Sequence, residues 1–167
     1  MIENLNGIHE TVKYKENSNV KLFINAEAED YPIHWHTPME IIMPLEGGYT
    51  VQIGDDLVHL NESDIIFIAS GVKHRLIAPD TGKRLILQIE WSAVSKIKEL
   101  NSILTLIAPA ITLTPETPGD IHSNIRKLLL DISDEYQTDS FLSEAVIYSK
   151  TVSYTHLRAH ETLMNLV

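Results

Sequence analysis

Residues 34–40, HWHTPME, place two imidazoles and one carboxylate at the spacing of a β-strand. Side chains two positions apart in an extended chain point to the same face, so His34, His36 and Glu40 can converge on one point inside a closed sheet. Gly47 follows Glu40 after six residues and marks a turn, because glycine tolerates a positive φ. The stretch therefore predicts a polar site on the inner face of a sheet.

A second stretch, residues 63–74 (SDIIFIASGVKH), supplies a third imidazole, His74, from a different strand. Three neutral histidine nitrogens and one carboxylate suit a borderline divalent metal, Zn, Fe, Mn, Ni or Cu, and leave positions open for water or a ligand. The candidate metal ligands are His34, His36, Glu40 and His74. If Glu40 points inward, Ile42 shares its side and Leu76 follows His74, which gives the site apolar walls.

These residues resemble the two motifs of the cupin fold, a small antiparallel barrel. The first motif is His-x-His, three or four residues, Glu, six residues and Gly, and residues 34–47 match it in full. The second motif is Gly, five residues, Pro-x-Gly, two residues, His, three residues and Asn. At these positions the chain has Ser63, Ala69, Gly71, His74 and Ala78. The missing Pro and Asn leave the histidine in place but weaken the case for an intact catalytic cupin.

A narrower resemblance covers residues 31–79, which are similar to the N-terminal sensory domain of AraC-type transcriptional regulators. That family joins such a barrel to two or more dimerisation helices and then to a C-terminal domain of two helix-turn-helix units that binds DNA. The resemblance implies a small-molecule effector, such as a sugar, and a regulator rather than an enzyme. The effector-binding residues would be His34, His36, Glu40, Ile42, His74 and Leu76. In such sensors these positions frequently form hydrogen-bonding pocket walls instead of a metal site.

Apolar runs between residues 11 and 91 recur at intervals of about 8 to 12, which is typical of a barrel or sandwich. With the cupin resemblance, the expected fold is mostly β: an antiparallel cupin (double-stranded β-helix) barrel followed by two or three α-helices. The predicted strands are 11–15, 20–26, 39–45, 49–53, 57–60, 64–69, 74–78 and 84–91, with turns at 47–48 and 54–55. Apolar residues then take helical spacing over 94–107 and 121–136, a short extended stretch lies between them at 111–114, and a further helix begins at Phe141.

We expect an effector-binding barrel at 1–91, a helical dimerisation and linker segment at 92–151, and a non-native tail at 152–167. The tail reads VSYTHLRAHETLMNLV and is similar to one reading frame of a transposase-based library adapter. It is therefore set aside from fold reasoning, and the DNA-binding domain is expected beyond Lys150 in the uninterrupted gene. The apolar stripe of helix 120–136 predicts a homodimer through that helix. Its members are Ile121, Ile125, Leu128, Leu129 and Ile132.

The net charge of −10 repels phosphate backbones, so we expect DNA contact only through the missing C-terminal domain. The lack of cysteine excludes disulfides, thiolate metal ligands and a cysteine nucleophile. The N-terminus has neither a basic start nor an apolar stretch, and no run approaches the length of a membrane span. These features predict a cytoplasmic protein without membrane contact.

Two other functions stay open. A stand-alone metal-dependent cupin enzyme, such as an isomerase or dioxygenase, would use the same four ligands, and a binding-only cupin would have no link to DNA. Residues 1–10 form either a regulatory arm or a frayed end. Trp35 is expected in packing, because it points away from the neighbouring histidines. Outside the cluster, His9, His59 and His122 are expected to be ordinary satisfied polar groups.

Overall fold

The structure is a computed structural model that describes residues 4–16, 18–90, 92, 108–138, 146 and 149–150. Within these residues the chain forms eleven β-strands and one long helix, α3 (Ile121–Thr138). The strands are β1 (Leu5–Asn6), β2 (His9–Glu10), β3 (Val20–Asn25), β4 (Tyr31–His34), β5 (Met39–Glu46), β6 (Tyr49–Ile53), β7 (Asp56–Leu60), β8 (Ile65–Ile68), β9 (His74–Ile77), β10 (Lys83–Ile89) and β11 (Ala110–Leu113). The expected mostly-β class is confirmed.

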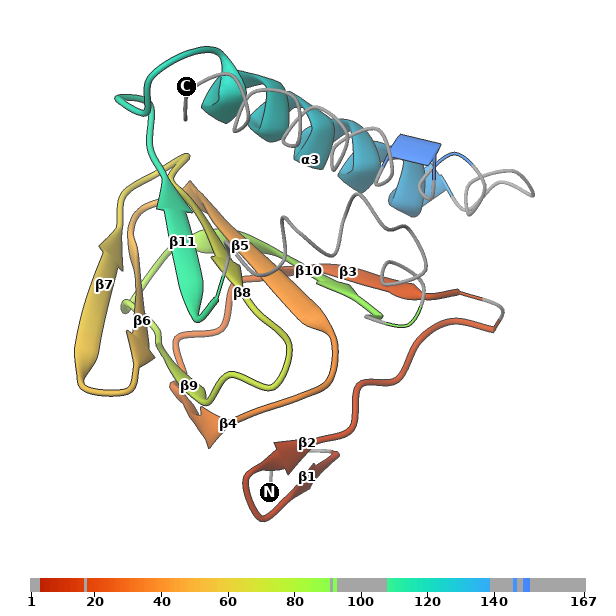
Figure 1. Ribbon diagram of the computed structural model, residues 1–167, viewed down its shortest axis with the longest axis vertical. Coiled ribbons are helices and arrows are strands. Elements are labelled where there is room, and N and C mark those ends of the chain that lie inside the picture. Colours follow the sequence, from red (N-terminus) through yellow and green to blue (C-terminus); the bar gives the residue numbers. More distant parts are fainter. Residues whose placement is uncertain are drawn as a thin grey trace.

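Two antiparallel sheets make up the body of the protein (Figure 1). One has the strand order β11-β8-β5-β10-β3, and the other has the order β4-β9-β6-β7. A cluster of buried apolar side chains from both sheets fills the space between them. Its members are Ile42, Tyr49, Val51, Leu60, Ile66, Ile68, Leu76 and Ile86. In the described residues the strands pair into two sheets that face each other, rather than into one closed barrel. The apolar interior lies between the two sheets.

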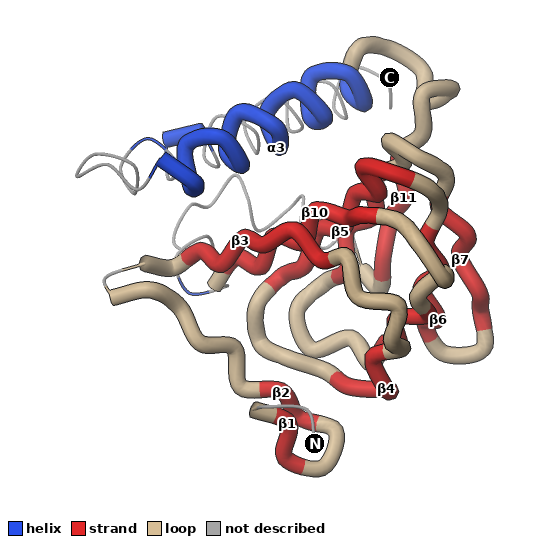
Figure 2. The backbone as a smooth tube through the Cα atoms, turned by 180° about the vertical axis from the view of Figure 1, so that it is seen from behind, coloured by secondary structure: helices blue, strands red, loops and turns tan. Residues whose placement is uncertain are grey.

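Strand β10 shows how alternation separates two cores. Leu85, Leu87 and Ile89 belong to a second buried cluster that includes residues of α3. The intervening Ile86 belongs to the cluster between the sheets. Successive side chains of a strand point to opposite faces, so the outer face of the larger sheet is covered by α3 while the inner face lines the interior (Figure 2).

Helix α3 packs on that sheet through Ile125, Leu129 and Ile132, each at most 3% exposed. The predicted helical stripe at 121–136 is therefore confirmed as a helix, and most of its apolar face is used within the subunit. Only this one long helix occurs in the described residues, where two or three were expected. The predicted helix at 94–107 and the start of the one at 141 lie outside the described residues, as does the tail at 152–167. None of the described helices is long and apolar enough to cross a membrane.

Most predicted strands agree with the observed ones to within one or two residues, and the extended stretch at 111–114 corresponds to β11. The turns at Gly47 and Gly54 are also confirmed, with φ values of +71° and +60°. The strand predicted at 11–15 is wrong, because that segment finds no partner strand in the described residues. Strand β4 was not predicted as a separate element, although the strand spacing of its last residue, His34, was recognised.

The N-terminal hairpin β1–β2 is held against the segment that follows β4. The Trp35 amide donates to the Ile8 carbonyl at 2.9 Å, and the Glu10 amide donates to the Trp35 carbonyl at 3.0 Å. The rings of His9 and Trp35 lie 4.4 Å apart between centroids. Trp35 therefore packs away from the interior as expected, and the hairpin brings Glu10 toward the space between the sheets.

Candidate metal centre and adjoining cavity

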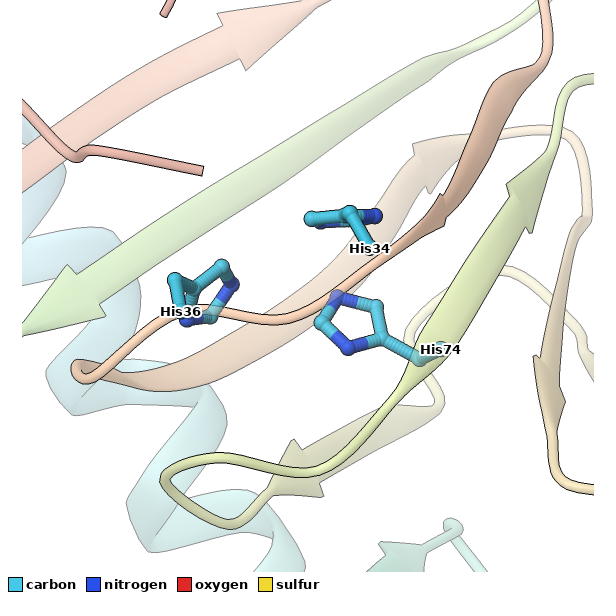
Figure 3. Close-up of side chains that lie close together, drawn as sticks. All are labelled: His34, His36 and His74. Carbon is cyan, nitrogen blue, oxygen red and sulfur yellow. The ribbon is translucent and has the colours of Figure 1, made fainter. Parts of the chain in front are cut away.

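Four predicted residues meet at one end of the interior. His34 ends β4 and pairs with His74, the first residue of β9, in the ladder between these strands. His36 follows two residues after His34, and Glu40 is the second residue of β5. All four are 1% exposed. The three imidazoles point toward one another (Figure 3), and one nitrogen from each lies within 4.8 Å of the others.

The three histidines share one local arrangement that determines which ring nitrogen carries the proton. In each, Nδ1 lies beside a backbone carbonyl two residues away. The acceptors are Pro32 for His34 at 3.0 Å, Pro38 for His36 at 3.0 Å and Val72 for His74 at 2.9 Å. A carbonyl can only accept, so Nδ1 must donate, and in the neutral ring Nε2 keeps its lone pair. This is the tautomer that metal-binding histidines use.

Glu40 adds acceptors at the same place. Its Oε1 accepts a hydrogen bond of 2.9 Å from Nε2 of Gln88, which lies opposite it on β10. Its Oε2 lies 3.1 Å from Nε2 of His74, and its Oε1 lies 3.5 Å from Nε2 of His36. Neither of these histidine nitrogens has a satisfactory hydrogen-bond partner. Buried lone pairs that face a carboxylate repel it unless a proton or a cation lies between them, so the residues fit a bound divalent metal.

The pKa values are shifted by burial and by these contacts. Burial lowers the pKa of His34 to about 4, with the neighbouring His74 adding to the effect. Burial also acts to lower the pKa of His36, but the close contact with Glu40 and the charge of that carboxylate outweigh it and raise the pKa. For Glu40, burial is outweighed by contacts with His36 and His74, which hold its pKa well below the usual range. An ionised carboxylate beside a neutral His34 is ready to bind a cation.

Glu10 is a site residue that sequence reasoning missed. It comes from β2, is 9% exposed, and places Oε2 at 3.5 Å from Nε2 of His34. Burial raises its pKa, since no contact compensates fully for the lost water. No local signal could have found it, because it lies 24 positions before His34 and reaches the site only through the docking of the hairpin.

A cavity of about 560 Å³ adjoins the cluster. Of the predicted effector-binding residues, His34, Glu40 and Leu76 line it, while His36, Ile42 and His74 are buried nearby but are not part of its lining. The lining also contains Tyr31, Tyr49, Arg84, Ile86 and Gln88, none of which was predicted. The cavity has a polar end at the histidine cluster and apolar side chains on part of its wall, as the inward placement of Glu40 suggested. Its lining also carries more charged residues than expected, such as Glu29 and Arg84.

Residues 22–89 match the model of the cupin domain family, which supports a cupin domain in this part of the chain. The matched range runs from within β3 to the end of β10 and includes every histidine of the cluster. No curated protein matches the chain.

Solved structures are also similar to this chain, one of them over more than the cupin range. A ToxT variant from Vibrio cholerae is similar over 89% of this chain and 58% of that chain, with 12% identity and a TM-score of 0.58. A cupin-2 domain protein from Shewanella frigidimarina is similar over 46% of this chain and 76% of that chain, with 19% identity and a TM-score of 0.41. A variant of Bacillus subtilis oxalate decarboxylase is similar over 46% of this chain and 22% of that chain, with 21% identity and a TM-score of 0.40. The ToxT likeness is one of fold and includes more of the chain than the cupin domain alone.

Proposed function

We propose that the chain is the effector-binding and dimerisation domain of an AraC-type transcriptional regulator, acting in the cytoplasm and not as an enzyme. The observation that carries this proposal is the cavity of about 560 Å³ that opens beside the buried cluster of His34 and Glu40 in a cupin domain. A cavity with a polar end and apolar walls is the usual construction of a small-molecule site. The resemblance of residues 31–79 to AraC-type sensors and the fold likeness to ToxT over 89% of the chain support it.

The effector would act by favouring one arrangement of the hairpin, the sheets and α3. Glu10 of the hairpin lines the cavity, so a bound molecule meets the hairpin directly. A hydrogen bond links α3 to the segment before β8: Nε2 of His122, on the helix, donates to the Ser63 carbonyl at 2.8 Å. A ligand shifts such an equilibrium only by its difference in affinity for the two arrangements, so contact with Glu10 is the proposed source of that difference.

The homodimer through helix 120–136 remains part of this proposal. Because Ile125, Leu129 and Ile132 pack against the sheet, a partner subunit would contact other side chains of the helix. Leu128 and Leu130 are half-buried and are the apolar candidates. DNA would be contacted only by the C-terminal domain that the family resemblance implies.

A divalent metal is the proposed cofactor of the cluster, held by His34, His36 and His74 through Nε2 and by Glu40. The metal would supply a positive charge between the facing histidine lone pairs and the Glu40 carboxylate. It would also polarise a ligand bound at its open positions. This geometry also supports a second candidate function, a metal-dependent cupin enzyme such as an isomerase or dioxygenase. Metal analysis of the purified protein, with His36→Ala as the comparison, tests whether the cluster holds metal.

Recovery of the uninterrupted gene downstream of Lys150 separates the two functions. Two helix-turn-helix units there, together with effector-dependent binding of the whole protein to its promoter DNA, would establish the regulator. A stop codon within a few residues would contradict it. In that case turnover of candidate substrates by the metal-loaded protein, lost in His36→Ala, would establish the enzyme.

A further inference from the structure

Arg84 lies at the end of the interior away from the histidine cluster. It shares the inner face of β10 with Ile86 and Gln88, because these residues alternate with the outward Leu85 and Leu87. Gln88 bonds to Glu40 of the cluster and lies four positions along the strand from Arg84, a distance of about 13 Å. Arg84 is 3% exposed and lines the cavity. The cavity therefore has a polar group at each end and Ile86 between them.

Among the described residues, the contacts of Arg84 are with uncharged groups. Its Nη2 donates to the Glu27 carbonyl at 2.6 Å, its guanidinium lies 4.4 Å from the centre of the Tyr49 ring, and its Nε has no partner. Among the residues that the structure describes, no carboxylate lies within ion-pair distance of it. Guanidinium stays charged in proteins, and a buried charge without a counter-ion is costly.

Two exposed cations, in contrast to Arg84, are each paired with a carboxylate. Arg75 donates to Asp30 at 2.7 Å, and Lys83 donates to Glu46 at 2.7 Å, although each is in contact with water. A purely structural role for Arg84 would rest on the Glu27 carbonyl and on Tyr49, neither of which carries a negative charge. A neutral amide would serve that role as well. An anion that enters the cavity and contacts the guanidinium would supply the direct counter-charge that Arg84 lacks.

The lining indicates which anion fits. Lys21 is the only other basic residue of the lining, and acidic residues outnumber the two cations. They are Glu10, Glu27, Glu29, Asp30 and Glu40. These acidic residues would strongly repel a doubly charged phosphate. A singly charged carboxylate instead matches the single guanidinium of Arg84, from which it can accept two parallel hydrogen bonds. Phe23, Leu76 and Ile86 offer apolar surface to the body of the ligand.

We infer that the cavity binds a small organic monocarboxylate, with its carboxylate held by Arg84 and its body lying along Ile86 toward the histidine cluster. Two further polar atoms of the lining are Oε1 of Gln88, which lacks a partner, and the Tyr31 hydroxyl, which lies beside Glu10. They are available to polar substituents of the ligand. The inference deepens the proposed function, on which it rests for the role of effector, by naming the chemical class of that effector.

The test measures ligand binding to the purified chain by thermal shift and titration calorimetry. The probes are butyrate, hexanoate, benzoate and lactate, each paired with its neutral amide, and phenyl phosphate as the dianion. We expect at least one acid to bind, its amide to bind more than about tenfold more weakly, and phenyl phosphate not to compete with it. Equal binding of acid and amide, stronger binding of the phosphate, or no binding by any acid would each overturn the inference.

Three variants locate the carboxylate. Arg84→Gln should lose the preference for acid over amide, and Arg84→Lys should keep part of it, because lysine keeps the charge but lacks the guanidinium fork. Lys83→Gln, at the exposed first residue of β10, is the matched control. Without ligand, Arg84→Gln should melt no lower than the parent, because an unpaired buried charge has been removed. Retention of acid preference in a folded Arg84→Gln would contradict the assignment. The acid and amide comparison on the parent protein decides the question even if that variant does not fold.

Failure of this inference and failure of the regulator proposal have different signatures. Loss of acid binding leaves the DNA-binding test on the whole protein untouched. A stop codon after Lys150 contradicts the regulator but leaves an Arg84 carboxylate site in place for the enzyme.

Discussion

Acid should destabilise this protein through His34 more than through any exposed histidine. His34 is 1% exposed, and burial lowers its pKa to about 4 in the fold, against about 6.5 in the unfolded chain. Between these two values the unfolded chain binds the additional proton, so stability rises with pH across this window and falls as the pH is lowered through it. Above pH 6.5 the histidine is neutral in both states and carries no such penalty.

The expected magnitude follows from the same two values. Moving from pH 7 to pH 5 should remove about 2 kcal/mol from the free energy of unfolding through His34 alone, and the loss should approach about 3 kcal/mol near pH 4. His36 acts in the opposite sense. Its raised pKa adds stability that is complete below about 6.5 and is lost as the pH rises through its folded pKa. A comparison of variants is needed to separate the two contributions.

Urea denaturation in the presence of a chelator, at pH 7 and pH 5, measures the effect. His34→Asn should lower stability at both pH values but lose about 2 kcal/mol less than the parent between them, because the titrating ring is gone while His36 remains. His59→Asn, at an exposed site on β7, should follow the parent. An equal loss between pH 7 and pH 5 in the parent and His34→Asn would refute the argument.

Four further predictions concern metal binding, packing, assembly and backbone conformation. Added Zn²⁺ or Ni²⁺ at about 100 times its dissociation constant should stabilise the protein by about 2.7 kcal/mol at neutral pH, as measured by thermal unfolding, and His36→Ala should abolish this gain. Leu129→Ala should cost about 2 to 5 kcal/mol in urea denaturation, because Leu129 is 3% exposed between α3 and the sheet. Leu128→Asp should instead yield a folded monomer in sedimentation if α3 pairs with a partner subunit, and an unfolded chain would count against that dimer. Gly82→Ala should be destabilising in thermal melts, since Gly82 has a φ of +135° and an added Cβ would lie 2.7 Å from the Glu46 carbonyl; an unchanged melting temperature would contradict it.

Local rules account for what was predicted well. The alternation of apolar residues and the glycines at 47 and 54 placed most strands and two turns, because strand faces and positive φ depend on neighbours along the chain. The spacing of His34, His36 and Glu40 predicted a shared site, and the fold brings them together with His74. Helix 121–136 followed from its period in the same way.

Contacts between distant segments account for what was missed. Residues 11–15 show the alternation of apolar and polar side chains that is typical of a strand. They have no neighbouring strand to pair with in the described residues. Glu10 reaches the site because its hairpin bonds to Trp35, and neither residue signals this contact in the sequence. The apolar stripe of helix 121–136 was assigned to contact with a partner subunit, whereas the sheet covers Leu129 and its buried neighbours; the homodimer itself stays a prediction.

The sequence alone determines which residues of β10 share a face, because the pleat of an extended chain repeats every two positions. It does not determine which face is inner. The tertiary structure decides that by packing α3 against Leu85 and Leu87, which leaves Arg84 inside without a carboxylate and Lys83 outside with Glu46. Two adjacent cations of one strand thus acquire different chemistry, because burial removes water from one and leaves it to the other.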